Sequence, residues 1–244
     1  PGDTIMGMDL LHGGHLTHGS PVNRSGLFYK AVHYTVNPQT EQLDYDMIAD
    51  LAREAKPKII VAGYSSYPWI PDWEKFKQIA ESVGAYLLAD VSHISGLIAA
   101  KVCSSPIGIA DVVTFTTHKT LCGPRGAVII THDKELGEKF DKGVFPGEQG
   151  GPHINTIAAM ALTFELARSE EFLKLQQQTL KNAAAFAAAF QKNGVRVPYN
   201  GTNSHLTLID CKSFRGPEGV PLNGDLAARI LDLVGIVVNR NTIP

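Results

Sequence analysis

Two residues that could do covalent chemistry stand where apolar segments end. Asp90 closes the run YLLAD, and Lys119 follows the run VVTFTTH 29 residues later. An amine with an ordinary pKa of about 10.4 is protonated at neutral pH, but burial or a nearby cation lowers that pKa. Lysines at apolar strand ends therefore become nucleophiles toward carbonyl groups. A carboxylate in such a place needs a positive partner or several hydrogen-bond donors.

Each residue alone has a simpler interpretation. A lone lysine is more often a solvated loop cation, and an aspartate after a strand is often a helix N-cap. The order of Asp90 and Lys119 within one parallel sheet is more specific than either residue alone. Pyridoxal phosphate needs an anion beside its ring nitrogen and an amine for its aldehyde. Asp90 and Lys119 predict that cofactor.

A histidine-rich loop, HGGHLTHG, precedes both residues. His12, His15 and His18 lie three residues apart, which raises the possibility of a metal site. The loop lacks a neighbouring carboxylate or cysteine, so we predict no metal there. Gly13 and Gly14 suit a backbone that comes close to a flat ligand, with an imidazole over the ligand's face.

The surrounding elements predict an α/β fold with a mostly parallel sheet flanked by helices. Two amphipathic helices, each opened by an aspartate, separate apolar segments typical of buried strands. In such a fold, ligands bind at the carboxyl ends of the strands. The predicted strands cover 4–8, 28–35, 58–63, 85–89, 111–115 and 126–131, and the helices cover 44–55 and 72–84.

The sequence pattern changes after residue 153. A nearly continuous helical pattern begins there, with a break around 168–170. Short β-rich runs and one more helix follow. We therefore predict a cofactor-binding large domain over 1–168, then a connecting helix and a partial small α+β domain over 169–244. The later strands are predicted at 195–198, 206–210 and 236–239, and the helix near 224–234.

Composition excludes several classes of protein. With 22 basic and 24 acidic residues, the net charge of −2 gives no electrostatic footprint for nucleic acid. No apolar stretch is long enough to span a membrane, and three scattered cysteines fit no disulfide framework. These features predict a cytoplasmic protein. Both ends of the chain look cut from something longer, which predicts an internal fragment.

Five motifs, in this order and at this spacing, resemble serine hydroxymethyltransferase, a pyridoxal-phosphate enzyme of fold type I. The likeness runs through essentially the whole chain. The motifs are HGGHLTHGSPVN at 12–23, DVSHISGLIA at 90–99, TTHKTLCGPRG at 116–126, VFPGEQGGP at 144–152 and VNRNTIP at 238–244.

The resemblance implies a role for individual residues. Lys119 would hold the cofactor aldehyde, Asp90 would pair with the pyridinium nitrogen, and His15 would lie over the ring. Together with Thr116 these residues form the implied catalytic set. Further cofactor contacts are implied for Ser65 and His93 near the phenolic oxygen, His118 at the phosphate, and Gly151 at the phosphate of a neighbouring subunit. Arg125 would line the same pocket, and the folate contacts would be Leu10, Gly14, Leu16 and Asn241.

The implied reaction converts L-serine and tetrahydrofolate into glycine and 5,10-methylenetetrahydrofolate. The implied assembly is a homodimer or a dimer of dimers with shared active sites. In this family the phosphate cradle, the proton-transfer glutamate and the substrate-pocket tyrosines precede the segment present here, and the arginine that grips the substrate carboxylate follows it. We therefore expect low activity from the 244-residue chain alone. The alternatives are a lyase of the threonine-aldolase type, which needs no folate, and a non-catalytic module for cofactor binding and oligomerisation.

Overall fold

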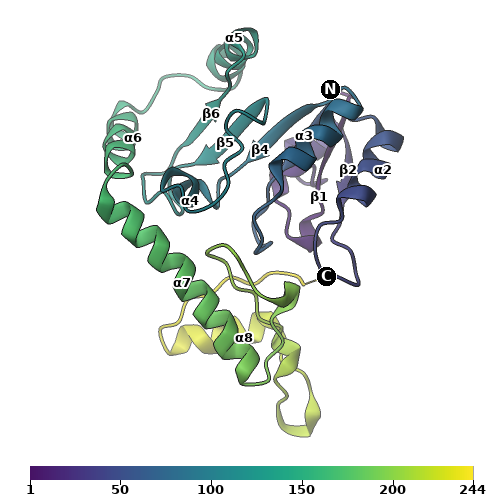
Figure 1. The fold of residues 1–244 in the computed structure, drawn as a ribbon, viewed down its shortest axis with the longest axis vertical. Helices are drawn as coiled ribbons and strands as arrows, with labels where there is room; N and C mark the ends of the chain where they lie inside the picture. Colours follow the sequence, from purple (N-terminus) through teal and green to yellow (C-terminus); the bar gives the residue numbers. More distant parts are fainter. Residues whose placement is uncertain (244) are drawn as a thin grey trace.

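A computed structural model describes residues 1–243, apart from the side chain of Pro217. Its centre is a six-stranded sheet in the order β2-β1-β3-β4-β5-β6 (Figure 1). The first five strands in that order are parallel, and β6 pairs antiparallel with β5. The bounds are β1 Thr4–Met8, β2 Lys30–Tyr34, β3 Ile59–Ala62, β4 Tyr86–Asp90, β5 Val112–Thr116 and β6 Ala127–Ile130. The predicted fold class is confirmed.

The central strands form the core. Ile60 and Leu87 face each other in the β3–β4 register, and both are fully buried. Strands covered on both faces read as continuous apolar runs, as the sequences IIVA and YLLAD do. All six predicted strands form. At β2 the strand starts at Lys30, because Asn23 caps a short helix, α1 (Arg24–Phe28), that includes the first predicted residue.

Two amphipathic helices, α2 (Tyr45–Ala55) and α3 (Trp73–Ser82), pack side by side on the sheet. Asp44 accepts hydrogen bonds from the first turn of α2, and Asp72 does the same for α3. Gly84 follows α3 in the left-handed conformation that ends helices. The predicted helices and their capping residues are confirmed.

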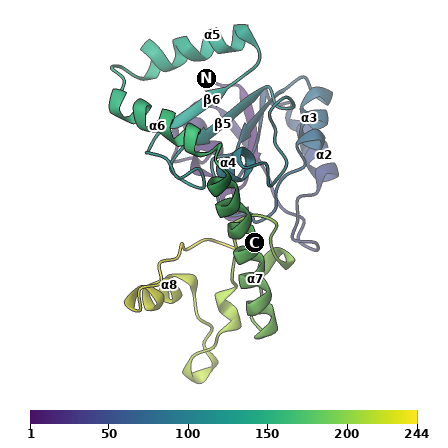
Figure 2. The same cartoon turned by 60° about the vertical axis from the view of Figure 1, so that its left-hand side comes forward.

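A second group of helices lies on the other side of the sheet (Figures 1 and 2). Residues around the end of α4 (Ser95–Ala99) and the end of α6 (Ile154–Leu166) share a small apolar cluster that includes Ala100, Leu121 and Phe172. Between β6 and α6 come α5 (Lys134–Lys142) and an irregular helical turn, Gly143–Glu148. Thus helices cover both faces of the sheet.

A long helix, α7 (Glu170–Lys192), leads away from the sheet, and a shorter one, α8 (Gly224–Leu233), lies beyond it (Figure 1). The predicted break between α6 and α7 is confirmed, with Ser169 capping α7. Single turns occur at Pro198–Asn200, Cys211–Ser213 and Pro217–Gly219. Near the C-terminus, Ile243 packs against the main core.

The three late strands were predicted wrongly. Within the described residues, the ranges 195–198, 206–210 and 236–239 contain no strand. A strand exists only where a neighbour supplies a hydrogen-bond ladder. In the first two ranges, one backbone bond joins the segments, from the Asp210 N–H to the Arg196 carbonyl. The β-branched composition of these ranges therefore did not determine their conformation.

In the part of the chain that the structure describes, no helix is both long enough and apolar enough to cross a membrane.

Candidate functional site

Several of the predicted site residues lie at one edge of the sheet. Asp90 is the last residue of β4, Thr116 is the last residue of β5, and Lys119 follows three residues later. Because these strands are parallel, their carboxyl ends meet at the same edge. The histidine-rich loop follows the end of β1, so it reaches the same edge.

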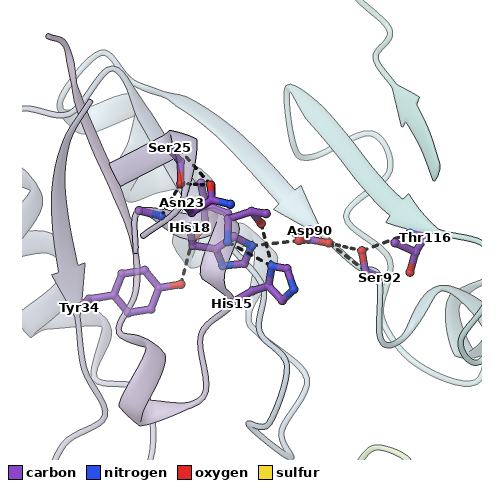
Figure 3. Close-up of polar contacts among 11 residues, drawn as sticks. His15, His18, Asn23, Ser25, Tyr34, Asp90, Ser92 and Thr116 are labelled. Atoms are coloured by element: carbon purple, nitrogen blue, oxygen red, sulfur yellow. Dashed lines mark hydrogen bonds and ion pairs between the residues drawn. The ribbon is translucent and has the colours of Figure 1, made fainter. Parts of the chain in front are cut away.

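Asp90 has three hydrogen-bond donors from its own chain (Figure 3). One carboxylate oxygen, Oδ2, accepts from His18 Nε2 at 2.9 Å. The other, Oδ1, accepts from the Ser92 backbone N–H at 3.1 Å and from the Ser92 hydroxyl at 2.6 Å. The Ser92 hydroxyl also accepts from the Thr116 N–H at 3.1 Å, so the ends of β4 and β5 are linked.

These donors determine the charge of Asp90. Burial alone would raise the pKa of this carboxyl group, but the hydrogen bonds from His18 and Ser92 outweigh it and hold the pKa at about 2. Asp90 is therefore a carboxylate at neutral pH. A carboxylate has about four lone-pair positions. Three donors leave one acceptor position on Oδ2 for another partner.

His18 is a site residue whose role the sequence did not reveal. Its side chain is only 4% exposed, and its ring lies 5.7 Å from that of His15 at a tilt of 59°. Because a carboxylate only accepts, His18 Nε2 carries the proton in the bond to Asp90. The three-residue spacing of the histidines was the available signal, and it suggested metal binding instead. Among the described residues, no group of three or more histidine, cysteine or acidic side chains is placed to hold a metal ion.

Two single helical turns, η1 (Leu10–His12) and η2 (Leu16–His18), form this loop, and His15 is the N-cap of the second. Its Nδ1 lies 2.8 Å from the Thr17 hydroxyl and also accepts the Thr17 N–H, which fixes the ring. Burial and the neighbouring His18 lower the pKa of His15, so the neutral imidazole is favoured. His15 is electrostatically coupled to Asp90 and Lys119 as well.

Lys119 is partly buried, and this burial lowers the pKa of its amine, although Asp90 opposes the shift. The Lys119 ammonium group also affects the pKa of His93, which lies in the turn after β4. Burial and Lys119 bring the pKa of His93 down to about 3. These electrostatic interactions link His15, Asp90, His93 and Lys119, while the catalytic roles assigned to them stay predictions.

Several buried polar atoms at the carboxyl ends of the strands have no hydrogen-bond partner among the described residues. They are Thr116 Oγ1, His118 Nδ1 and, after β3, Ser65 Oγ. Buried polar groups are nearly always paired in native proteins, so exceptions point to a ligand or ordered water. In contrast, the Ser65 backbone N–H is paired, with the Gly13 carbonyl at 2.7 Å.

The paired glycines bring the loop onto its own strand. A Cβ on Gly14 would lie 2.1 Å from the Met8 carbonyl oxygen, and Gly13 adopts a φ of +114° beside the backbone of Ser66 and Tyr67. The sequence interpretation explained both glycines by the approach of a ligand. The structure explains them by close packing between backbone segments.

The remaining predicted residues lie at the margin. Arg125 is exposed, with its guanidinium 3.4 Å from His118 Nε2. Leu10 and Leu16 are each 44% exposed on the loop. Gly151 and Asn241 are exposed on segments outside the cluster. Their roles stay predictions.

Comparison with known proteins gives a consistent result. The serine hydroxymethyltransferase family model matches residues 1–244. The chain is similar to serine hydroxymethyltransferases from Cyanothece sp. and Nostoc punctiforme, each 53% identical over the whole chain, and from Synechococcus sp., 51% identical. It spans 56% to 58% of the length of these relatives.

Proposed function

Because this chain belongs to the serine hydroxymethyltransferase family, we propose that the complete protein transfers a one-carbon unit from L-serine to tetrahydrofolate, with pyridoxal phosphate as cofactor. One observation carries the proposal. Asp90 keeps a single free acceptor position on a carboxylate with a pKa of about 2, in the same cluster as the Lys119 amine, whose pKa burial lowers from its ordinary value. An anion and an amine are the two groups that this cofactor requires of a protein.

The residues at the sheet edge fit the cofactor in other ways. Asp90 would hold the proton of the ring nitrogen, since its charge persists through the physiological pH range. His15, which is predominantly neutral, would lie over the ring without repelling that proton. The unpartnered groups of Thr116, His118 and Ser65 would supply polar contacts to the bound molecule. When bound, pyridoxal phosphate stabilises the electron pair released as a bond to the amino-acid Cα breaks.

Lys119 and its neighbours would move protons in this reaction. Because burial lowers the pKa of Lys119, a larger fraction of its amine is neutral than in an exposed lysine. The neutral nitrogen can act as a nucleophile or accept a proton. His93, with its pKa near 3, stays uncharged beside it, so burial rather than a cationic imidazole lowers the pKa of the amine. Ser92 holds Asp90 and the end of β5 together.

The finer assignments belong to the same proposal. Leu10, Gly14, Leu16 and Asn241 would contact folate, Arg125 would line the pocket, and Gly151 would reach the phosphate of a neighbouring subunit in a homodimer or a dimer of dimers. We further propose a large domain over 1–168 and a smaller one over 169–244, in a cytoplasmic protein. The start of α7 at Glu170 and three free thiols support these two assignments.

The test compares two lysine variants of the complete protein, Lys119→Ala and Lys134→Ala. Lys134 is exposed on α5 and serves as the control. We expect formation of glycine from serine to depend on tetrahydrofolate, to disappear in Lys119→Ala, and to persist in Lys134→Ala. Turnover of serine that is unchanged without folate would favour an aldolase-type lyase instead. Full activity of Lys119→Ala would refute the proposal.

The 244-residue chain alone should show little transferase activity, because it spans only 56% to 58% of its relatives. Its activity is measured beside that of the complete protein. Equal turnover would show that the chain contains every group the reaction needs.

A further inference from the structure

His205, which the sequence did not single out, lies against the candidate site. Its ring stacks on that of His93, with centroids 5.9 Å apart and planes 20° from parallel. It comes from the segment after α7, far along the chain from the turn that carries His93. Its Nδ1 is buried and has no hydrogen-bond partner among the described residues. The contact is therefore held by ring packing rather than by polar bonds of that atom.

The segment that carries His205 is fixed to the loop after β3. The Trp69 indole N–H donates to the Tyr199 carbonyl at 2.9 Å, and Asn203 Oδ1 accepts from the Ile70 N–H at 2.7 Å. The Thr202 hydroxyl donates to the Pro68 carbonyl at 3.0 Å. A ring contact, Tyr67 against Tyr199, adds to these bonds. His205 is thus delivered to the site by a well-bonded segment.

The groups that face the histidine pair are mostly cationic or neutral. His93 is coupled to Lys119, His205, Asp90 and His15, and Asp90 is the one anion in that set. A charge on either imidazole would be placed in a partly buried region beside the Lys119 amine. Each ring shields part of the facing side of the other from water, which disfavours that charge further.

We propose that His205 is a positioning residue for His93, and that its stacked ring keeps the His93 imidazole uncharged and correctly oriented beside Lys119. The role in catalysis rests on the proposed function. The geometric relation between the two histidines does not, so the two can be tested separately.

The direct test is NMR titration of the 244-residue chain without cofactor, labelled with ¹⁵N-histidine. The His93 signal is assigned by its loss in His93→Gln. In His205→Ala, one face of His93 becomes hydrated, and we expect its pKa to rise by about one unit or more. In His205→Phe the stacked face stays covered, so the pKa should remain low. His205→Gln keeps a polar side chain without a ring and should resemble His205→Ala.

An unchanged pKa of His93 in a folded His205→Ala chain would overturn the proposal, as would equal shifts in His205→Ala and His205→Phe. If His205→Ala does not fold, Asn203→Ala provides a second measurement. This change removes the bond to Ile70 and should loosen the segment, giving a smaller shift in the same direction. No shift in Asn203→Ala would then contradict the proposal.

The complete protein with cofactor gives a second readout. If His93 must be neutral for the reaction, its higher pKa in His205→Ala should move the acidic limb of the kcat profile to higher pH, while His205→Phe leaves that limb in place. If the pKa of His93 rises but the acidic limb does not move, the catalytic role of His205 is refuted. The effect of His205 on the charge of His93 then still holds.

Discussion

The ends of β4 and β5 lie side by side, but their polar groups differ in how far other residues satisfy them by hydrogen bonds. At the end of β4, Asp90 is surrounded by donors from His18 and Ser92, so its charge is stabilised by the protein itself. At the end of β5 and just after it, buried polar atoms of Thr116 and His118 have no partner among the described residues. In the first region the protein itself supplies donors to both carboxylate oxygens. The second is arranged as expected for a surface that binds a polar ligand.

The largest expected effect of a single substitution comes from changing Asp90, at the end of β4. Asp90→Ala leaves the His18 Nε2–H and the Ser92 N–H without their acceptor. Each unsatisfied buried donor costs about 1–3 kcal/mol, so two of them should lower the free energy of unfolding by about 2–6 kcal/mol. Urea denaturation of the 244-residue chain measures this loss.

Asp90→Asn is the matched control. The amide oxygen can still accept from Ser92, and His18 can change tautomer to accept from the amide nitrogen. That tautomer places a proton on His18 Nδ1, which has no partner among the described residues. The expected loss is about 1–2 kcal/mol. Equal stability of the alanine and wild-type chains would show that the Asp90 network does not stabilise the fold.

Two adjacent threonines sharpen the comparison. Thr117 is fully buried, and its hydroxyl donates to the Pro124 carbonyl at 2.5 Å, whereas the buried Thr116 hydroxyl oxygen is unpartnered within the described chain. Thr117→Val should therefore cost about 2 kcal/mol of unfolding free energy. Thr116→Val should be neutral or stabilise the chain by up to about 1 kcal/mol, while weakening the binding of pyridoxal phosphate. Urea denaturation and cofactor titration measure the two properties.

A loss of stability in Thr116→Val as large as that in Thr117→Val would contradict the distinction between the two hydroxyl groups. It would show that Thr116 is already satisfied without a ligand.

Acid should weaken the folded chain through the stacked histidines. The pKa values of His93 and His205 fall from an ordinary 6.5 to about 3 and about 4. Below pH 6.5 these histidines therefore bind protons in the unfolded chain but not in the folded chain. The free energy of unfolding falls as the pH falls toward 4. Each histidine contributes a slope of up to about 1.4 kcal/mol per pH unit, reached near the middle of this window.

The control is the double variant His93→Phe/His205→Phe, which keeps two stacked rings but cannot take up protons. Its unfolding free energy, measured by urea denaturation at several pH values, should depend less steeply on pH than that of the wild-type chain between pH 6.5 and 4. Identical slopes would mean that neither histidine has a lowered pKa in the folded chain.

The local part of the structure could be predicted from the sequence. Apolar runs marked the six strands of the sheet, and Asp44 and Asp72 marked the starts of two helices. Because parallel strands share an edge, the placement of Asp90 and Lys119 at the same edge of the sheet followed from the same pattern.

Contacts between distant segments could not be predicted. His18 reaches Asp90 across 72 residues, and His205 reaches His93 across an even longer interval. A single sequence contains no periodic signal for such pairs. The prediction of the late strands was wrong for a related reason. β-branched residues favour an extended conformation, but they do not specify the neighbouring strand that a sheet requires.

The most direct test of the central claim is to identify the lysine that binds the cofactor. The complete protein is mixed with pyridoxal phosphate, reduced with borohydride to fix any lysine-bound pyridoxal group, digested, and mapped by mass spectrometry. The account predicts the added mass on the peptide that contains Lys119, with no such label in Lys119→Ala. A label on another lysine, or equal labelling of the Lys119→Ala protein, would contradict it.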